Sequence, residues 1–260
     1  MAYLLAAHAD RVLERLRVEL VRAAESPSEP RIHALRVSLK KLATLMRLVR
    51  SMAPELGRGS RAMRHLKVLF DAAGRVREAQ VARGLVAALP RRVDRAHRAF
   101  DAWLIQEELR ARSTVRRRLD ACKPKHLERI AKKLMEANAG MTRAQELRHT
   151  ARYADHQLEA ARRLLACMDP VERLHEVRKH VKNAWYALRL LQARSAERAR
   201  AARLDAIQRR LGDWQDLRML LTLLARWDRG GEAGAALQRE VKRKLQRIEP
   251  ALLRASLKAL

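Results

Sequence analysis

Residues 29–40 read EPRIHALRVSLK, and residues 171–182 read VERLHEVRKHVK. Each stretch has a histidine, an arginine three residues later, a lysine seven residues later and a further arginine fourteen residues later. The residues in the two copies are His33, Arg36, Lys40 and Arg47, and His175, Arg178, Lys182 and Arg189. All four pairs are 142 residues apart, and a pattern that recurs at one offset indicates an internal duplication.

A second, shorter match follows each of these stretches. Residues 73–78 read AGRVRE, and residues 211–216 read LGDWQD. The offset between Gly74 and Gly212 is 138 rather than 142 residues, so the intervening loop is four residues shorter in the second copy. The two motifs keep their order, which predicts a chain built from two repeats, residues 1–141 and 142–260.

The composition predicts a helical protein. The chain has 260 residues with only 9 Gly and 7 Pro, and its apolar residues recur at helical spacing. No stretch of useful length alternates apolar and polar residues with a period of two, so we expect no strands. We expect a kink or a break at Gly74, a break at Gly212, and a long helix that opens at Pro90. The fold class is therefore all-α, and the duplication predicts two packed bundles related by a pseudo-twofold axis.

The repeated helix has two opposite faces. At about 100° per residue, the four motif residues of each copy, from the histidine to the second arginine, fall within a sector of about 60°. The opposite face is apolar in both copies: Leu35, Leu39, Leu42, Leu45, Met46 and Val49, and Val177, Val181, Ala184, Ala187, Leu188 and Leu191. From Arg31 to Arg50 there are six basic residues and no acidic one. Because like charges three and four residues apart repel, this stripe suggests a bound anion.

The net charge points to a polyanionic partner of some kind. The chain has 57 Lys+Arg and 29 Asp+Glu, a formal charge of +28. Nucleic acid, an anionic membrane surface and a phosphate polymer all fit this charge. No run reaches the roughly 20 apolar residues that span a bilayer. The two cysteines, Cys122 and Cys167, give neither a disulfide framework nor a zinc pattern, which favours the cytoplasm, and we expect no metal or other cofactor.

The two motifs together resemble the CHAD domain, the conserved histidine α-helical domain. The resemblance covers roughly residues 3–258 and is to the stand-alone form of the family. It implies a pseudo-symmetric pair of four-helix bundles, and a basic groove or central pore that binds inorganic polyphosphate. We expect a binding protein that catalyses no reaction. It also implies association with polyphosphate granules.

The resemblance, carried over by position, assigns candidate residues. The polyphosphate-binding candidates are His33, Arg36, Lys40, Lys41, Arg47, His175, Arg178, Lys179, Lys182 and Arg189. Further anion contacts are expected at His65, Arg77 and Arg203. Position 41 aligns with Asn183, so the two copies differ at that place.

Three other functions stay open at this point. Non-specific nucleic-acid binding follows from the charge, although the aromatic residues that stack on bases are few. Peripheral membrane binding would need apolar helix faces that the bundles do not use. A polyphosphate-processing enzyme would need an arrangement of acids or a nucleophile and base, and none is recognisable in the sequence.

Overall fold

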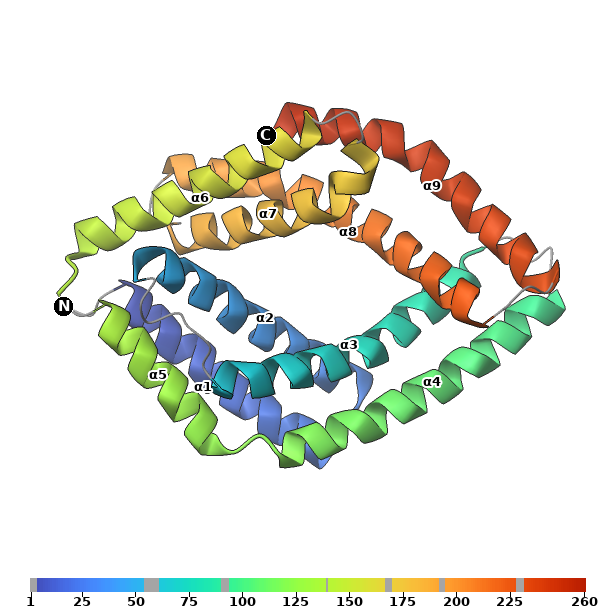
Figure 1. The fold of residues 1–260 in the computed structure, drawn as a ribbon, viewed down its shortest axis with the longest axis horizontal. Helices are drawn as coiled ribbons and strands as arrows, with labels where there is room; N and C mark the ends of the chain where they lie inside the picture. Colours follow the sequence, from blue (N-terminus) through green and yellow to red (C-terminus); the bar gives the residue numbers. More distant parts are fainter. Residues whose placement is uncertain are drawn as a thin grey trace. The chain divides into compact units, whose positions relative to one another are not determined.

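The structure is a computed structural model that describes residues 4–53, 61–89, 94–138, 140–166, 170–191, 195–227 and 232–260. This part of the chain is all-helical (Figure 1). The helices are α1 (Leu4–Glu25), α2 (Glu29–Met52), α3 (Arg61–Ala87), α4 (Asp94–Asp120), α5 (Pro124–Asn138), α6 (Arg143–Leu165), α7 (Pro170–Leu190), α8 (Ser195–Trp227) and α9 (Glu232–Ala259). The predicted fold class, all-α, is confirmed.

The predicted helix break at Gly212 is wrong, and no break occurs at Gly74. Gly74 lies inside α3 and Gly212 lies inside α8, and both helices are continuous there. A glycine in a helix interior costs only about 1 kcal/mol relative to alanine. Buried neighbours on the same helices, such as Val76 and Leu211, stabilise the helix by more than that. The expected helix start at Pro90 lies outside the described residues.

The helix α2 is set by local signals at its start and by its apolar face along its length. Ser28 is the extended residue before the helix, Pro30 lies in the first turn, and the Ala53 N–H donates to the Val49 carbonyl at the end. All six predicted core residues of α2 are buried: Leu35, Leu39, Leu42, Leu45, Met46 and Val49. The predicted core face is confirmed.

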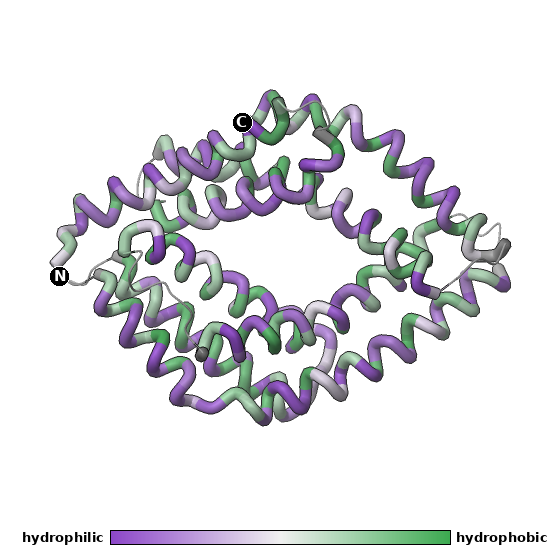
Figure 2. Tube along the Cα trace, in the orientation of Figure 1, coloured by the Kyte–Doolittle hydropathy of each residue, from purple (hydrophilic) through white to green (hydrophobic). Residues whose placement is uncertain are grey.

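The helix α7 repeats this arrangement. Its predicted core residues are also all buried: Val177, Val181, Ala184, Ala187, Leu188 and Leu191. Figure 2 shows polar and apolar residues interleaved along the helices, as expected where each helix buries one face. The basic residues of α2 and α7 are therefore held on the face turned away from the core.

The chain divides into two compact units. Unit 1 contains residues 1–74, 111–157 and 183–201, and unit 2 contains residues 75–110, 158–182 and 202–260. Each unit takes segments from both predicted repeats. The units are defined by packing and the repeats by sequence, so this division does not test the predicted boundary after residue 141. The duplication stays a prediction, and the all-helical structure is compatible with it.

In unit 1, α1 packs against α2 and α5. The junction between the predicted repeats also lies here, and α6 begins there with a capping box. The Thr142 N–H donates to Gln145 Oε1 at 2.7 Å, and the Gln145 N–H donates to Thr142 Oγ1 at 3.3 Å. Gly140, just before the box, has φ of 80°, a value that favours glycine.

Unit 2 has an aromatic core contributed by α4 and α8. The rings of Phe100 and Trp227 lie 5.1 Å apart, and Phe100 stacks on Trp103 at 5.7 Å. The buried Trp214 of α8 donates from Nε1 to Glu249 Oε1 of α9 at 2.8 Å. These contacts fix α8, which carries residues that face α7.

Candidate anion-binding site

Arg36 of α2 makes two contacts with one residue of the neighbouring helix α3. Its Nη1 donates to the Phe70 carbonyl of α3 at 3.0 Å, and its guanidinium carbon lies 4.6 Å from the centre of the Phe70 ring. A hydrogen bond and a cation–π contact from one neighbouring residue restrict the side chain to one orientation. Arg36 is half-buried, so its charge is presented at the edge of the helix pair.

Gly74 of α3 leaves room for the guanidinium of Arg36 in its observed position. A Cβ atom placed on Gly74 would lie 2.7 Å from Arg36 Nη1, which is closer than real Cβ contacts. The second motif of the sequence, built around Gly74, therefore serves the first motif directly. In the second copy, a Cβ atom on Gly212 would meet no atom within 4 Å.

The other residues of the first stripe differ in exposure. His33, Lys41 and Arg47 are exposed, and Lys40 is half-buried. Arg47 donates from Nη1 to Asn183 Oδ1 of α7 at 3.5 Å. The amide of Asn183 in turn donates to Gln157 Oε1 of α6 at 3.1 Å. Arg47 thus belongs to a polar network within unit 1.

In unit 2, the second stripe starts at His175. Its Nδ1 lies 2.6 Å from Gln215 Oε1 of α8, within hydrogen-bond distance. This contact joins the two sequence motifs of the second copy. The exposed imidazole is thereby oriented with its Nε2 away from Gln215.

Arg178, the counterpart of Arg36, faces an acid instead of a carbonyl. Arg178 is half-buried, and burial lowers its pKa while the charge of Asp216 opposes this effect. Its Nε has no hydrogen-bond partner within the described part of the chain. Burial also raises the pKa of Asp216, and Asp213 adds to the rise. Three cations oppose that rise: Arg178, Lys182 and Arg77.

The structure thus brings four predicted residues of unit 2 into one electrostatic cluster. Lys182 and Arg77 join Arg178 around Asp216, and His175 reaches the adjacent Gln215. Lys179 behaves differently, because its Nζ forms an ion pair with Glu176 Oε1 at 2.7 Å on its own helix. That pair is exposed and contributes little stability, so it can be exchanged for another anion.

The three further predicted contacts, His65, Arg77 and Arg203, have different surroundings. His65 of α3 stacks on the buried His126 of α5, with ring centres 4.6 Å apart. Burial lowers the pKa of His126, and the nearby His65 lowers it further. Arg203 is an exposed residue of α8, and Arg77 is part of the Asp216 cluster.

A pocket in unit 1 collects residues that the sequence did not single out. Its volume is about 440 Å³, and it is lined by His8, Val37, Lys41, Thr44, Leu45, Leu48, Tyr153, Trp185, Tyr186, Ala187, Arg189 and Leu190. Two of these, Lys41 and Arg189, are predicted anion contacts from the two repeats. Trp185 is half-buried on the pocket wall. The mismatch between Lys41 and Asn183 was the one sequence signal at this place.

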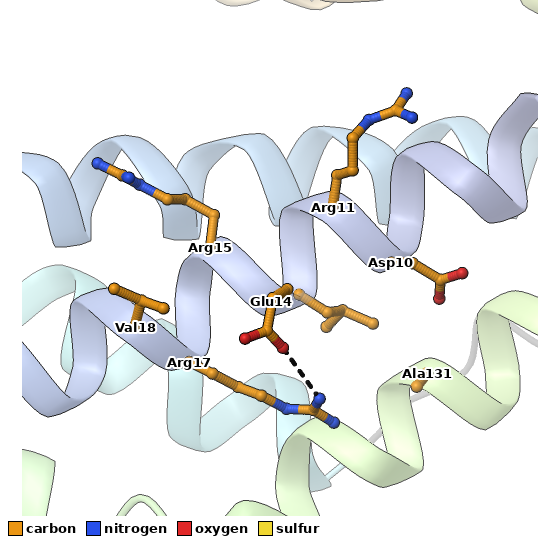
Figure 3. A pocket seen from close by; sticks show the side chains of 8 residues that line it. Asp10, Arg11, Glu14, Arg15, Arg17, Val18 and Ala131 are labelled. Atoms are coloured by element: carbon orange, nitrogen blue, oxygen red, sulfur yellow. Dashed lines mark hydrogen bonds and ion pairs between the residues drawn. The ribbon is translucent and has the colours of Figure 1, made fainter.

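A wider depression of about 650 Å³ lies between α1 and α5 of unit 1. In Figure 3, Glu14 and Arg17 form an ion pair on the side of α1 toward Ala131, and Arg11 and Arg15 extend away from that side. Asp10 adds a second carboxylate to the lining. Acids and bases are mixed here, so this surface does not favour a polyanion, and it contains no predicted site residue.

Within the described residues, no three His, Cys, Asp or Glu side chains come together as metal ligands do. The described helices also include none with the length and apolar character needed to cross a membrane. Cys122 is a free thiol, and burial raises its pKa.

The sequence model of the CHAD domain matches residues 4–225, most of the chain. The chain belongs to the CHAD domain family. The resemblance that the two His-Arg-Lys motifs suggested is therefore confirmed. Both basic stripes and both glycine motifs lie inside the CHAD match, and α9 lies beyond its end.

A solved CHAD structure also matches this fold. The chain is similar to the crystal structure of the CHAD domain from the plant Ricinus communis, with a TM-score of 0.76 and 20% sequence identity. The match covers 99% of this chain and 91% of the plant chain. At this identity the likeness is one of fold. No curated protein matches the sequence.

Proposed function

We propose that this CHAD protein binds inorganic polyphosphate along the basic faces of α2 and α7 and catalyses no reaction. The observation that carries the proposal is the basic face of α2. The stretch from Arg31 to Arg50 has six Lys and Arg residues and no acid, and Arg36, Lys40 and Arg47 of these lie with His33 on one face, opposite a buried face. Repulsion among these charges is relieved when a polyanion lies along the helix.

The arrangement of the cations suits a linear phosphate polymer. His33, Arg36 and Lys40 follow one another at one-turn intervals, so a polymer with a charge on every unit meets a cation at each turn. The contacts of Arg36 with Phe70 orient its guanidinium before the ligand arrives, which reduces the entropy lost on binding. A planar guanidinium also binds phosphate oxygens in pairs.

The proposal also covers the place in the cell where the protein acts and the ligands that compete with polyphosphate. A cytoplasmic protein that binds polyphosphate in this way would collect on polyphosphate granules. Nucleic acid stays a weaker, non-specific partner, because a charge of +28 attracts any polyanion. Aromatic residues are 3% of the chain, which offers few surfaces for stacked bases.

The main test is a double charge reversal, Arg36→Glu with Arg178→Glu. We expect it to abolish binding of long-chain polyphosphate in an equilibrium titration while the helical circular dichroism is retained. The control is Arg129→Glu with Arg254→Glu, two exposed residues of α5 and α9, which lowers the net charge equally. Equal loss in both variants would show that only the total charge acts and would contradict the site.

A competition experiment separates polyphosphate from nucleic acid. We expect duplex DNA at equal phosphate concentration to leave most of the polyphosphate bound. Displacement of the polyphosphate by DNA would reverse the ranking of the two ligands. The absence of catalysis is tested by incubating the protein with polyphosphate and Mg²⁺, where sustained release of phosphate would overturn it.

A further inference from the structure

The pocket of unit 1 has a charge pattern that the rest of the site does not explain. Lys41 of α2 and Arg189 of α7 both line it, and none of the residues that line it carries a carboxylate. Two like charges in one partly enclosed space raise each other's energy, and an anion between them removes that cost. The pocket is therefore suited to an anionic ligand.

The first repeat shows how such a cation is otherwise accommodated. Arg47 is the repeat counterpart of Arg189, and it donates to Asn183, the counterpart of Lys41. At that place the amide oxygen of Asn183 accepts a hydrogen bond from Arg47, so a neutral protein group already contacts the arginine. At the reciprocal place in the same unit, lysine replaces the amide, and the described residues that line the pocket include no carboxylate or side-chain amide for Arg189, which instead contacts the Trp185 ring. The departure from symmetry at positions 41 and 183 thus adds a second cation, Lys41, to the lining that contains Arg189.

The walls of the pocket are aromatic and apolar. Trp185, Tyr153 and Tyr186 line it together with aliphatic side chains of α2. The Arg189 guanidinium carbon lies 4.8 Å from the centre of the Trp185 ring, so the cation and the ring share one side of the cavity. A chain of phosphates has no group that would use these apolar walls.

The remaining polar groups of the pocket are neutral donors and acceptors. Burial, with Arg11 and Lys41 adding to the effect, lowers the pKa of His8 to about 4, so the imidazole is uncharged at pH 7. Burial raises the pKa of the Tyr153 and Tyr186 hydroxyls, which therefore stay protonated. Such groups bind the polar edge of a ring or sugar.

We propose that this pocket binds a small phosphate ester that carries a planar ring, of the size and chemistry of a nucleoside monophosphate. The phosphate lies between Lys41 and Arg189, and the ring lies against Trp185 and the tyrosines. The volume of about 440 Å³ is within the range of about 300–1,000 Å³ typical of small-molecule sites. This ligand class is distinct from the polymer bound along the helices.

The test is calorimetric titration of the full chain with AMP as the probe. Adenosine and inorganic phosphate serve as arms that carry only the ring or only the charge. We expect AMP to bind at least about tenfold more tightly than either fragment, because only AMP uses both parts of the pocket. Equal affinities for AMP and inorganic phosphate would overturn the recognition of a ring, and no binding of AMP at millimolar concentration would overturn the site.

Variants place the ligand in the pocket. We expect Lys41→Gln and Trp185→Leu each to weaken AMP binding by about tenfold or more. Arg50→Gln is the matched control, since it removes one exposed charge of α2 outside the pocket and leaves AMP affinity unchanged. Lys41 is exposed, so its variant reports on binding even where Trp185→Leu disturbs folding. Unchanged affinity in Lys41→Gln would contradict the assignment.

Measuring the polyphosphate affinity of the pocket variants distinguishes the proposed pocket ligand from the proposed binding of polyphosphate along the helices. Trp185→Leu leaves every charge of the protein in place, so we expect polyphosphate affinity to be unchanged while AMP affinity falls. A parallel loss of both ligands would mean that the pocket is only one end of the polymer site. Loss of AMP with intact polyphosphate binding supports a separate ligand.

Discussion

Arg36 and Arg178 occupy the same place in the two repeats but have different surroundings. Arg36 is held by the carbonyl and the ring of Phe70, and both of these partners are neutral. Arg178 is half-buried beside Asp216, a carboxylate that attracts the same guanidinium a phosphate would need. Matching residues in a duplicated sequence therefore predict position on a helix, but the neighbouring helix decides how available each charge is.

The core faces of the two repeats should not show this difference between the copies, because matching residues on them are buried to a similar extent. Met46 and its counterpart Leu188 are 3% and 0% exposed. We expect Met46→Ala and Leu188→Ala each to lower the free energy of unfolding by about 2–5 kcal/mol, measured by denaturant titration. Equal costs would show that the repeats differ only on their polar faces, whereas a small cost at one site would show looser packing there.

Single substitutions of Arg36 and Arg178 should weaken polyphosphate binding to different extents. We expect Arg36→Gln to weaken polyphosphate binding by about tenfold or more, and Arg178→Gln to weaken it less, because Asp216 already competes for that charge. Asp216→Asn should then increase the affinity of the otherwise unchanged protein. The measurement is the dissociation constant at fixed salt, and a larger loss for Arg178→Gln than for Arg36→Gln would contradict the comparison.

The two glycines offer a matched pair for stability. Gly212→Ala meets open space, so we expect it to stabilise α8 by up to about 1 kcal/mol. Gly74→Ala gains the same helix propensity but displaces the Arg36 guanidinium from Phe70, so its net effect should be lower by about 1 kcal/mol. Thermal melts measure the difference, and identical shifts would show that Arg36 relocates without cost.

The dependence of stability on pH should also differ between the two units, because His8 of unit 1 and Asp216 of unit 2 contribute to it with opposite sign. The folded-state pKa of His8 is lowered to about 4 from an ordinary value of 6.5, so the unfolded chain binds more protons in between. His8 therefore makes the free energy of unfolding rise with pH across that window. Burial raises the pKa of Asp216, so above pH 3.8 the folded state binds more protons and this group makes the free energy fall with pH.

Two variants separate these opposing contributions. His8→Gln should flatten the rise in the free energy of unfolding between about pH 4 and 6.5, and Asp216→Asn should remove the opposing fall above pH 3.8. Denaturant titrations at several pH values measure both slopes. A steeper rise in His8→Gln than in the parent protein would contradict the neutral state of this histidine.

The sequence predicted the two basic stripes and their core faces because these depend on helical periodicity alone. It failed at Gly212, where the cost of glycine in a helix is small compared with the burial around it. It also could not find the pocket, since His8, Tyr153 and Trp185 come from three helices that are distant in sequence. Only tertiary packing brings them together, and the one trace of the pocket in the sequence is the mismatch between Lys41 and Asn183.

The make-up of the two compact units has a consequence for how the protein assembles. Each unit needs segments from both sides of the junction at Gly140 and the Thr142 cap. Two polypeptides separated at that junction, residues 1–141 and 142–260, would each lack part of both units. We expect neither fragment to melt cooperatively alone and the mixture to regain a cooperative transition, which would make this chain a natural starting point for a split reporter.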